Sequence, residues 1–368
     1  MSKRSREQRR RARTTAGDVN PSEPGASTAC SALTKTQKRK LQKQRAKAAA
    51  AAAAKAAKST TSPRSNAANA AHNGGGSSTA PLAVVYEDEH AIVVSKPAGL
   101  LCHPSPGFWD RGTVTHMLAD RQRLPSYSAV PAEMLEARQS YTGEDDSFIP
   151  RAVVHRLDRG TTGALLLAKS SVAEAHFAAQ FKGRTTQKRY VALLQGRPSV
   201  QHNDGVSISI QPDSGLHVSA PIGRDPTRPG KMKVDKQGKA AYSVVYMHAY
   251  SSEEDLCLVS VELLSGRTHQ IRVHCAECLG APLINDEMYD MAERVAAARR
   301  RFHSVTSLAR GRPLLHAWSL QLPHLGSMGT LAVRAPLPAD MCALIESAWP
   351  GMPSDEPSAW PLLSLDQL

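Results

Sequence analysis

Residues 153–165 read VVHRLDRGTTGAL, in which two apolar runs flank a loop of polar residues and glycines. The apolar runs predict buried strands, and the glycines allow a tight backbone between them. The loop carries one carboxylate, Asp158. An aspartate is ionised at neutral pH and can act as a nucleophile, and loops on a rigid scaffold often carry catalytic groups. Composition alone favours a simpler interpretation, in which Asp158 closes an Asx turn beside a surface arginine.

A second group of polar residues follows the strand that we predict for residues 256–263. The pattern after it predicts a helix over residues 268–279, with Thr268 as its N-cap. His269 and Arg272 are three residues apart, so they share a face near the start of this helix. A helix N-terminus together with an arginine can hold a phosphate, or can pair with a catalytic carboxylate and keep it ionised.

The remaining hydrophobic pattern mixes strands and helices without regular βαβ alternation. We therefore predict an α+β fold with a largely antiparallel sheet. A helix is predicted over residues 172–181. Strands are predicted at residues 82–86, 91–95, 152–154, 164–168, 189–194, 241–246 and 256–263.

Two segments look like insertions into this pattern, residues 121–147 and residues 291–312. The arginines of the second segment are Arg294, Arg299, Arg300, Arg301, Arg310 and Arg312. They could form a surface that contacts RNA, although a solvated basic helix is the simpler interpretation.

Positive charge is concentrated at the start of the chain. The whole sequence has 46 Lys and Arg against 33 Asp and Glu. Residues 1–80 hold 17 of these bases and 3 of the acids, a balance of +14, while the rest of the chain is near neutral at −1. Such an excess of positive charge can neutralise phosphates, which favours nucleic acid as a partner. The scarcity of bulky apolar residues in this segment predicts a disordered tail.

Composition divides the chain into a disordered basic low-complexity tail at residues 1–80, a folded domain at residues 81–345 and a C-terminal extension at residues 346–368. Basic clusters at residues 3–13 and 35–47 suggest the nucleus or nucleolus as the location. The mitochondrion and the cytoplasm are the alternatives, and a solvated tail without any address fits equally well.

Six cysteines are scattered over the 368 residues, which indicates free thiols in a reducing, intracellular compartment. No apolar run approaches the roughly 18 residues that a membrane helix needs, so we expect no membrane association. Cys275 and Cys278, with His274 beside them and His269 nearby, suggest a zinc site. Helical spacing places both thiols in the core instead, and no second cysteine pair is near, so we expect no metal.

The loop at residues 155–163 resembles the signature loop of the RluA-type RNA pseudouridine synthases. Further segments match this family in the same order along the chain, from residue 81 to the region of residue 336. Residues 86–99 resemble its opening strands and turn, residues 188–192 its tyrosine motif, residues 266–274 its third motif and residues 314–317 its closing strand. Several motifs in one order make the resemblance specific.

The resemblance implies the pseudouridine synthase fold, with a central active-site cleft, and a reaction on RNA. A uridine is flipped out of the RNA, its N-glycosidic bond is broken, and the uracil is turned and rejoined through carbon. Asp158 would be the nucleophile, Tyr190 would lie against the uracil and serve in proton removal, and Arg272 would pair with Asp158. The resemblance implies no metal and no cofactor. Attack on the ribose and attack on the uracil ring both stay open.

The resemblance also implies RNA contacts. Arg156 would enter the RNA stack where the target base has left it, and Arg267, His155, Thr161 and His269 would lie along the RNA. Both arginines fit a structural role as well, and both histidines fit a scaffold of hydrogen bonds. The expected partner is a structured rRNA, tRNA or mRNA, and we expect a monomer.

This sequence departs from the family pattern at four positions. Ser95 stands where Asn is usual, Thr162 replaces a frequent Ser, Ser265 a frequent Thr and Asn285 the usual Gly. These differences leave the three catalytic candidates untouched and bear on the choice of target. The alternative function is a non-catalytic RNA-binding or RNA-chaperone protein on the same fold.

Overall fold

The computed structural model describes residues 82–104, 112–119, 152–201, 206–210, 215–303, 312–354 and 356–362. All of them lie in one compact unit, Gly75–Leu368. The other unit, Met1–Gly74, lies outside the described residues, as does the segment 121–147 that we interpret as an insertion. The disordered tail and the division into domains therefore stay predictions.

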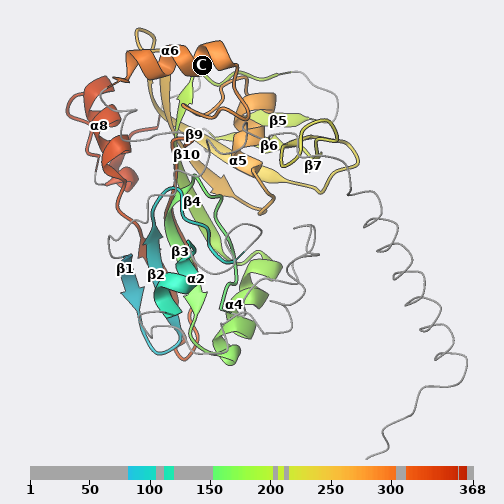
Figure 1. Cartoon of the computed structure of the whole chain (residues 1–368), viewed down its shortest axis with the longest axis vertical. Helices are drawn as coiled ribbons and strands as arrows, with labels where there is room; N and C mark the ends of the chain where they lie inside the picture. Colours follow the sequence, from blue (N-terminus) through green and yellow to red (C-terminus); the bar gives the residue numbers. More distant parts are fainter. Residues whose placement is uncertain are drawn as a thin grey trace, which may run out of the picture. The chain divides into compact units, whose positions relative to one another are not determined.

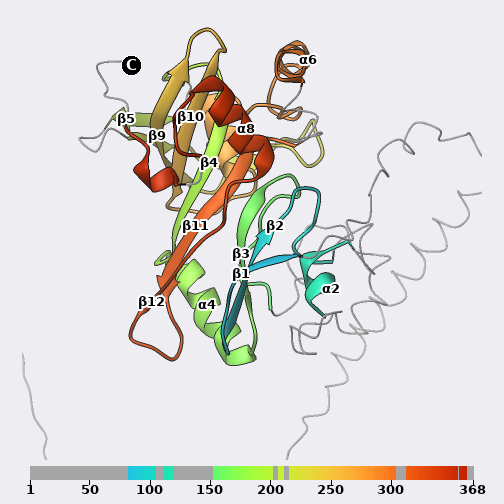
Figure 2. The ribbon, with the colours of Figure 1, turned by 90° about the vertical axis from the view of Figure 1, so that its left-hand side faces the viewer.

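A large sheet organises the described unit (Figures 1 and 2). Its strands, in spatial order, are β1 (Ala83–Glu87), β2 (Ala91–Lys96), β3 (Thr162–Ala168), β11 (Leu315–Pro323), β4 (Gln187–Gln195), β10 (Leu256–Leu263), β9 (Tyr242–Ser251), β6 (Leu216–Ser219) and β5 (Ser207–Ile210), with β12 (Thr330–Arg334) paired to β11. Strands β3 and β11 are parallel, and the other pairings among these strands are antiparallel. The predicted α+β fold with a largely antiparallel sheet is confirmed.

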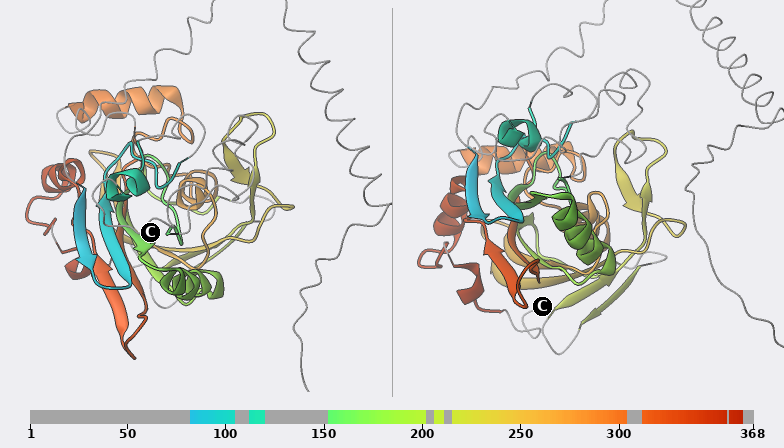
Figure 3. Two further views of the ribbon diagram at one scale, coloured as in Figure 1. Left: turned by 60° about the horizontal axis from the view of Figure 1, so that its bottom comes forward. Right: turned by 90° about the horizontal axis from the view of Figure 1, so that it is seen from below.

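Helices lie around this sheet, and a small hairpin stands beside it (Figure 3). The helices are α2 (Val114–Ala119), α4 (Ser171–Gly183), α5 (Gln270–Val273), the π-helix η3 (His274–Cys278), α6 (Ala292–Arg301), α8 (Ala339–Ala348) and the 3₁₀ turn η4 (Pro357–Ala359). The hairpin is formed by β7 (Ile222–Arg224) and β8 (Met232–Val234). None of the helices in the described ranges has the length and apolar character needed to cross a membrane.

Strand β3 is buried on both faces, which explains its unbroken apolar sequence. Leu165 packs on one face against residues of β4 and β10, and Leu166 packs on the other face with Phe177 of α4. A strand that is covered on both sides needs apolar residues at successive positions, because neither face meets water. The strand predicted at residues 164–168 is therefore confirmed.

The helix predicted over residues 268–279 differs in its start and in its winding. The chain enters it through His269, which has φ 57, and α5 then gives way to the π-helix η3. Thr268 is not its N-cap. Instead, Oε1 of Gln270 accepts a hydrogen bond from the backbone N–H of Arg267 at 3.0 Å. The predicted cap is wrong because a side chain inside the helix folds back to bond the turn before it.

Two other boundaries differ from the sequence pattern. The strand predicted at residues 152–154 is only an isolated bridge between Val153 and Leu167. The limit predicted at residue 345 falls inside α8, and Trp360 beyond it is buried in a cluster with residues of β4 and β11. The described part of the C-terminal extension therefore packs against the domain.

Candidate active site

The loop that carries Asp158 rests directly on the segment leading into β11. A Cβ atom on Gly163 would lie 2.2 Å from the carbonyl oxygen of Ala317, and a Cβ on Gly160 would lie 2.9 Å from Cδ of Pro313. The first distance involves backbone, which cannot move aside cheaply. Gly163 also has φ 110, a conformation that favours glycine. The loop therefore requires both glycines in order to approach β11 this closely.

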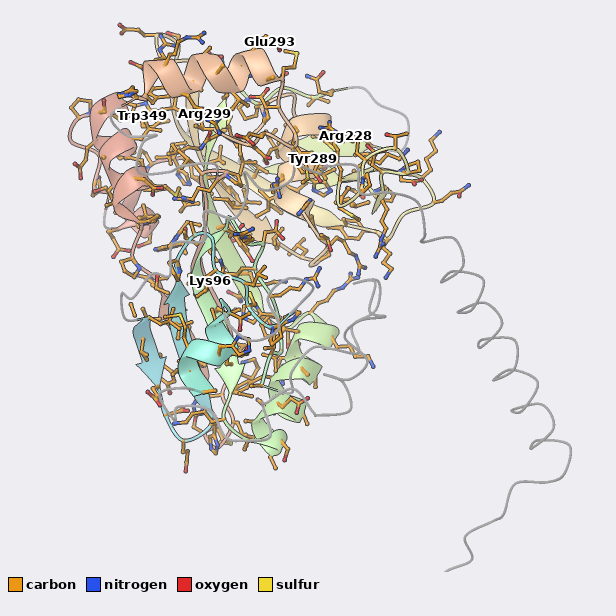
Figure 4. All side chains as sticks on the ribbon, in the orientation of Figure 1. Lys96, Arg228, Tyr289, Glu293, Arg299 and Trp349 are labelled. Carbon is orange, nitrogen blue, oxygen red and sulfur yellow. The ribbon has the colours of Figure 1, made fainter. Side chains whose placement is uncertain are left out.

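Lys96, at the end of β2, fixes the backbone of the residue after Asp158. Figure 4 marks Lys96. It is 0% exposed, and Nζ donates to the carbonyl oxygens of Leu100 at 2.8 Å, Pro97 at 3.0 Å and Arg159 at 3.2 Å. Burial lowers the pKa of Lys96 to about 8. Gly99 donates its N–H to the same Arg159 oxygen at 2.9 Å, and Nε of Arg159 donates to the Gly99 oxygen at 3.0 Å. The turn after β2 thus holds the loop through its backbone.

Cys102 fixes the backbone of the residue before Asp158. Its Sγ accepts from the N–H of Leu157 at 3.2 Å and donates to the carbonyl oxygen of Leu157 at 3.3 Å. Burial raises the pKa of the Cys102 thiol, so the thiol keeps the proton that it donates. The sequence alone does not single out Cys102, because a lone cysteine carries no spacing signal, and it shows Lys96 only as part of a turn.

Asp158 faces two basic side chains and remains accessible to solvent. Its side chain is 25% exposed, and its Oδ2 lies 3.6 Å from Nη1 of Arg272 and 3.8 Å from Nε2 of His269. The structure therefore brings together three residues that the sequence predicts for one site. Both contacts are longer than a hydrogen bond, so Asp158 is held loosely.

Arg272 has a tighter partner than the predicted one. Its Nε and Nη2 each donate to a different carboxylate oxygen of Asp286, both at 2.7 Å. The guanidinium also lies 4.9 Å from the centre of the Tyr289 ring. Burial by itself would lower the pKa of Arg272, but the neighbouring carboxylates, Asp286 first, raise it. The expected pairing of Arg272 with Asp158 is thus secondary to a bidentate pair that the sequence does not reveal.

Tyr190 lies in β4, between Val261 of β10 and Ala317 of β11. It is 9% exposed and belongs to the main hydrophobic cluster. Burial, and then the negative charge of Asp158, raise the pKa of the Tyr190 hydroxyl. A hydroxyl in this environment stays neutral at physiological pH, so it can donate or accept a hydrogen bond but carries no charge.

Two of the predicted RNA contacts, Arg156 and Arg267, are at least partly accessible to solvent. Arg156 is exposed, and its Nη2 donates to Oγ1 of Thr268 at 3.4 Å. Nε of Arg267 donates to the carbonyl oxygen of Ala240 at 3.0 Å. Each guanidinium retains donors that are free for other acceptors in this geometry, because an arginine has five N–H groups.

His155 and Thr161 are used inside the protein instead. Nε2 of His155 accepts from the N–H of Leu166 at 2.9 Å, its ring stacks on Phe181, and burial lowers the pKa of His155 to about 3. Thr161 is 2% exposed, and its N–H donates to the carbonyl oxygen of Asp158 at 3.1 Å. These contacts fit a scaffold role, and RNA contact by either residue stays a prediction without geometric support.

Most of the arginines in the segment 291–312, which we considered as an RNA-contacting surface, bond to other groups of the protein. Arg294 donates to the carbonyl oxygen of Gln195 at 2.9 Å, Nε of Arg299 to Oδ1 of Asn285 at 2.7 Å, and Arg301 pairs with Glu254 at 3.1 Å. Arg312 is buried and forms a bidentate pair with Asp340. Arg310 lies outside the described residues. Arg294, Arg299 and Arg301 therefore hold α6 to the body of the protein, while Arg300 is exposed.

The candidate zinc ligands are built into the core. Cys275 and Cys278 are both 0% exposed, as the helical spacing predicts. Nδ1 of His274 lies 3.0 Å from Oγ of Ser243, and its Nε2 lies 3.1 Å from the carbonyl oxygen of Ala220. Both ring nitrogens are thus already paired. Within the described ranges, no group of three His, Cys, Asp or Glu side chains could hold a metal ion.

This arrangement suits covalent catalysis by a carboxylate. Asp158 is accessible and only loosely held, so an oxygen can reach an electrophilic carbon. Arg272 supplies a positive charge 3.6 Å from this carboxylate. Tyr190 is buried in β4, and its raised pKa keeps the hydroxyl neutral, so the hydroxyl can take part in a hydrogen bond.

Comparison with known proteins gives one consistent result. Residues 90–277 match the family profile of RNA pseudouridylate synthase. The chain is similar to ribosomal large subunit pseudouridine synthase D of Nitrosomonas europaea, with 36% identity over 270 residues that cover 73% of this chain and 65% of that relative. The protein of the same name from Zymomonas mobilis is 32% identical over 267 residues, 72% of each chain. Among solved structures, human RNA pseudouridylate synthase domain containing 4 aligns with a TM-score of 0.47 and 24% identity, over 70% of this chain and 89% of that one.

Proposed function

Because this chain belongs to the RNA pseudouridylate synthase family, we propose that it isomerises uridine to pseudouridine in RNA, with Asp158 as the nucleophile. The observation that carries the proposal is the position of Asp158. Its carboxylate is accessible at the tip of a loop fixed on both sides by Lys96 and Cys102, and it faces Arg272. A nucleophile needs this combination of a rigid backbone and a free oxygen.

The reaction breaks one bond and makes another on the same base. An oxygen of Asp158 forms a bond to the ribose or to the uracil ring, the N-glycosidic bond breaks, and the uracil turns so that C5 bonds to C1′ of the ribose. The bond to Asp158 breaks again before the product leaves, and the carboxylate is restored. The proton that C5 carried then leaves, and N1 gains one, so atoms and charge balance. In this proposal Tyr190 guides the departing proton, and it does so as a neutral hydroxyl rather than as a phenolate, because its pKa is raised.

The substrate class in this proposal is a structured RNA with the target uridine flipped out of its stack. Flipping is needed because the reacting atoms are inaccessible inside a helix. Arg156 stands two residues before Asp158 and is exposed, which supports its proposed entry into the vacated stack. The relatives described above are named for ribosomal large-subunit RNA, and we extend that class of target to this chain as part of the proposal.

The test uses purified full-length protein and the variant Asp158→Asn. The variant keeps the size of the side chain and removes its nucleophilic charge, so pseudouridine formation should fall by at least about 10³-fold. Pseudouridine is measured by mass spectrometry of digested RNA, and thermal unfolding checks the fold. Asp255→Asn is the matched control, because Asp255 has φ 47, which asparagine tolerates, and lies in the turn at the far end of β10.

Activity of Asp158→Asn close to that of the unchanged protein would overturn the assignment of the nucleophile. The alternative of a non-catalytic RNA-binding or RNA-chaperone protein makes a different prediction. In that case the unchanged protein would bind RNA but form no pseudouridine. Pseudouridine maps of cells with and without the protein would then show the same modified uridines.

Residues 1–80 are proposed to add affinity for RNA and a nuclear or nucleolar address, through their balance of +14. Removing residues 1–78 should lower non-specific RNA affinity and flatten its dependence on salt, because fewer counterions are released on binding. Fluorescence anisotropy across a salt series measures this, with a tail of equal length and Gln in place of Lys and Arg as the control. If removing the tail changed neither the RNA affinity nor the cellular location of a fluorescent fusion, the tail would have neither of these roles.

A further inference from the structure

A line of polar groups connects the β7–β8 hairpin to the nucleophile. The backbone N–H of Met232, in β8, donates to Oη of Tyr289 at 2.9 Å. Oη of Tyr289 lies 2.9 Å from Nδ1 of His269. Nε2 of His269 faces Oδ2 of Asp158 at 3.8 Å. Figure 4 marks Tyr289, which lies beside the hairpin.

The hydrogen bonds in this line run in one direction. A backbone N–H can only donate, so Oη of Tyr289 accepts from Met232. The hydroxyl hydrogen is then directed to Nδ1 of His269, which must carry a lone pair. If Nδ1 of His269 carried the proton instead, both Met232 and His269 would donate to the Tyr289 oxygen. The hydroxyl hydrogen of a tyrosine that is only 9% exposed would then have no acceptor among the contacts of the described residues, which is costly.

The charge at the other end of the line requires the same tautomer. If Nδ1 of His269 is bare, the single proton of a neutral imidazole is on Nε2, the nitrogen that faces the Asp158 carboxylate. The reverse tautomer would turn a lone pair towards a negatively charged oxygen. Burial lowers the pKa of His269, which favours the neutral ring over the imidazolium.

We propose that Met232, Tyr289 and His269 form a directed hydrogen-bond chain that presents the Nε2–H of His269 to Asp158. The proposal rests on the proposed function and adds a positioning device to it. Arg272 and His269 both face Oδ2. Together they hold that oxygen, and the other oxygen, Oδ1, attacks the nucleotide. Tyr289 is a positioning residue, since it acts on the nucleophile only through its neighbours.

The chain also gives the hairpin a role at the site. The tautomer of His269 depends on Tyr289, and Tyr289 depends on a backbone donor in β8. Lys231 lies 5.3 Å from the centre of the Tyr289 ring and Arg272 lies 4.9 Å from it, so the ring is held between cations from the hairpin and from the site. A displaced hairpin would therefore release Tyr289 and leave the His269 proton free to occupy either nitrogen.

The first experiment observes the tautomer directly. Protein labelled with ¹⁵N in its histidine rings is studied by long-range ¹H–¹⁵N NMR at neutral pH, and the His269 signals are assigned by their loss in His269→Gln. We expect a proton on Nε2 and none on Nδ1. A resting ring with its proton on Nδ1, or with protons on both nitrogens, would overturn the proposal.

Tyr289→Phe tests the middle of the chain. It removes the hydroxyl and keeps the ring against Arg272. We expect an increased share of the Nδ1–H tautomer, and a kcat about tenfold lower with KM changed less than kcat. Tyr250→Phe is the matched control, because its hydroxyl bonds Asp255 near the far end of β10. Tautomer and kcat both unchanged in Tyr289→Phe would contradict the chain.

His269→Gln and His269→Asn separate positioning from stability. A glutamine amide reaches the place of Nε2 and can donate to Asp158, whereas an asparagine amide reaches only the place of Nδ1. The backbone at His269 has φ 57, which asparagine tolerates better than glutamine, so His269→Asn should be the more stable variant. We expect kcat to follow the opposite order, with Gln retaining more activity than Asn. A kcat order that follows stability would overturn the proposal.

Failure of the chain and failure of the proposed function can be told apart. The NMR spectra need no turnover, so they decide on the chain even if the unchanged protein forms no pseudouridine. Conversely, full activity combined with the wrong tautomer would reject the chain and leave the proposed function standing.

Discussion

Arg272 is shared between two carboxylates, and the sharing is unequal. Asp286 takes two donors at 2.7 Å, while Asp158 receives only a loose contact at 3.6 Å. A bidentate pair with Asp158 would occupy both of its oxygens and oppose attack on a substrate. Asp286 therefore orients the guanidinium while leaving the carboxylate of Asp158, the proposed nucleophile, available.

Asp286→Asn tests this division of roles. Arg272 and Asp286 are 9% and 1% exposed in their side chains, so removal of one charge leaves a buried cation without its main partner. We expect the free energy of unfolding to fall by about 3 kcal/mol. We also expect kcat to fall by about tenfold or more, because Arg272 then turns towards Asp158. Urea unfolding and single-turnover kinetics measure the two effects.

Glu287→Gln is the matched control for Asp286→Asn. Glu287 is the next residue, its side chain is 57% exposed, and it pairs with Arg299 at the surface. An exposed pair contributes less than about 1 kcal/mol, so both measurements should change little. Equal effects of the two substitutions would mean that Asp286 has no special hold on Arg272.

The sequence predicts the nucleophile and its cation better than it predicts their partners. Asp158 and Arg272 stand in motifs that match a known family, and the structure brings them together. The sequence does not reveal Asp286 as the tighter partner, because spacing along the chain cannot decide which of two carboxylates a guanidinium chooses. Tyr289 is also missed, since a tyrosine beyond a predicted helix reads as an ordinary packing residue.

At the scale of elements, strands are predicted more reliably than the ends and winding of helices. β3 has a long apolar run between turn signals, so its existence follows from residues 164–168. The predicted strand at residues 152–154 fails because only one bridge forms there, at Val153. Three apolar residues do not by themselves determine a strand, because their pairing depends on which neighbouring strand the fold supplies.

The change from α5 to the π-helix η3 could not be read from the sequence. Cys275 and Cys278 have the spacing of an α-helical core stripe, and both are buried as that spacing predicts. The wider turn is set by tertiary contacts, such as those of His274 with Ser243 and with the Ala220 carbonyl oxygen. Because π-turns arise from such local competition for hydrogen bonds, no residue type signals them.

Across the described unit, three histidines, two of them fully buried and one half-buried, hold separate elements together in the neutral form. His155 accepts from the backbone of β3, His274 links η3 to β9, and His316 joins β11 to Thr162. Burial lowers the pKa of these histidines to about 3, about 4 and about 4, from an ordinary value of 6.5. The folded state therefore binds fewer protons than the unfolded chain between about pH 6.5 and pH 4.

Because the folded state binds fewer protons than the unfolded chain, we expect acid to destabilise the fold. The folded pKa values are lowered, so protonation favours the unfolded chain, and stability falls as the pH drops below 6.5. Each histidine contributes up to about 1.4 kcal/mol per pH unit over this window. Urea unfolding at pH 7, 6 and 5 measures the slope. His155→Gln keeps an acceptor for Leu166 and cannot titrate, so it should have a shallower slope than the unchanged protein.

An equal slope in His155→Gln and the unchanged protein would exclude His155 as a source of the acid sensitivity. His303→Gln is a suitable control, because His303 is exposed in the described unit and its replacement should leave the slope as it is.

The supports of the Asp158 loop have a consequence for how such a protein diversifies. Lys96 and Cys102 hold the backbone of Arg159 and Leu157, and Gly163 rests on a backbone oxygen of Ala317. Every L-amino acid except proline supplies the same peptide groups, so most substitutions of the exposed loop side chains should leave the supports intact. The exposed surface of the loop can therefore change by single mutations while its backbone stays in place.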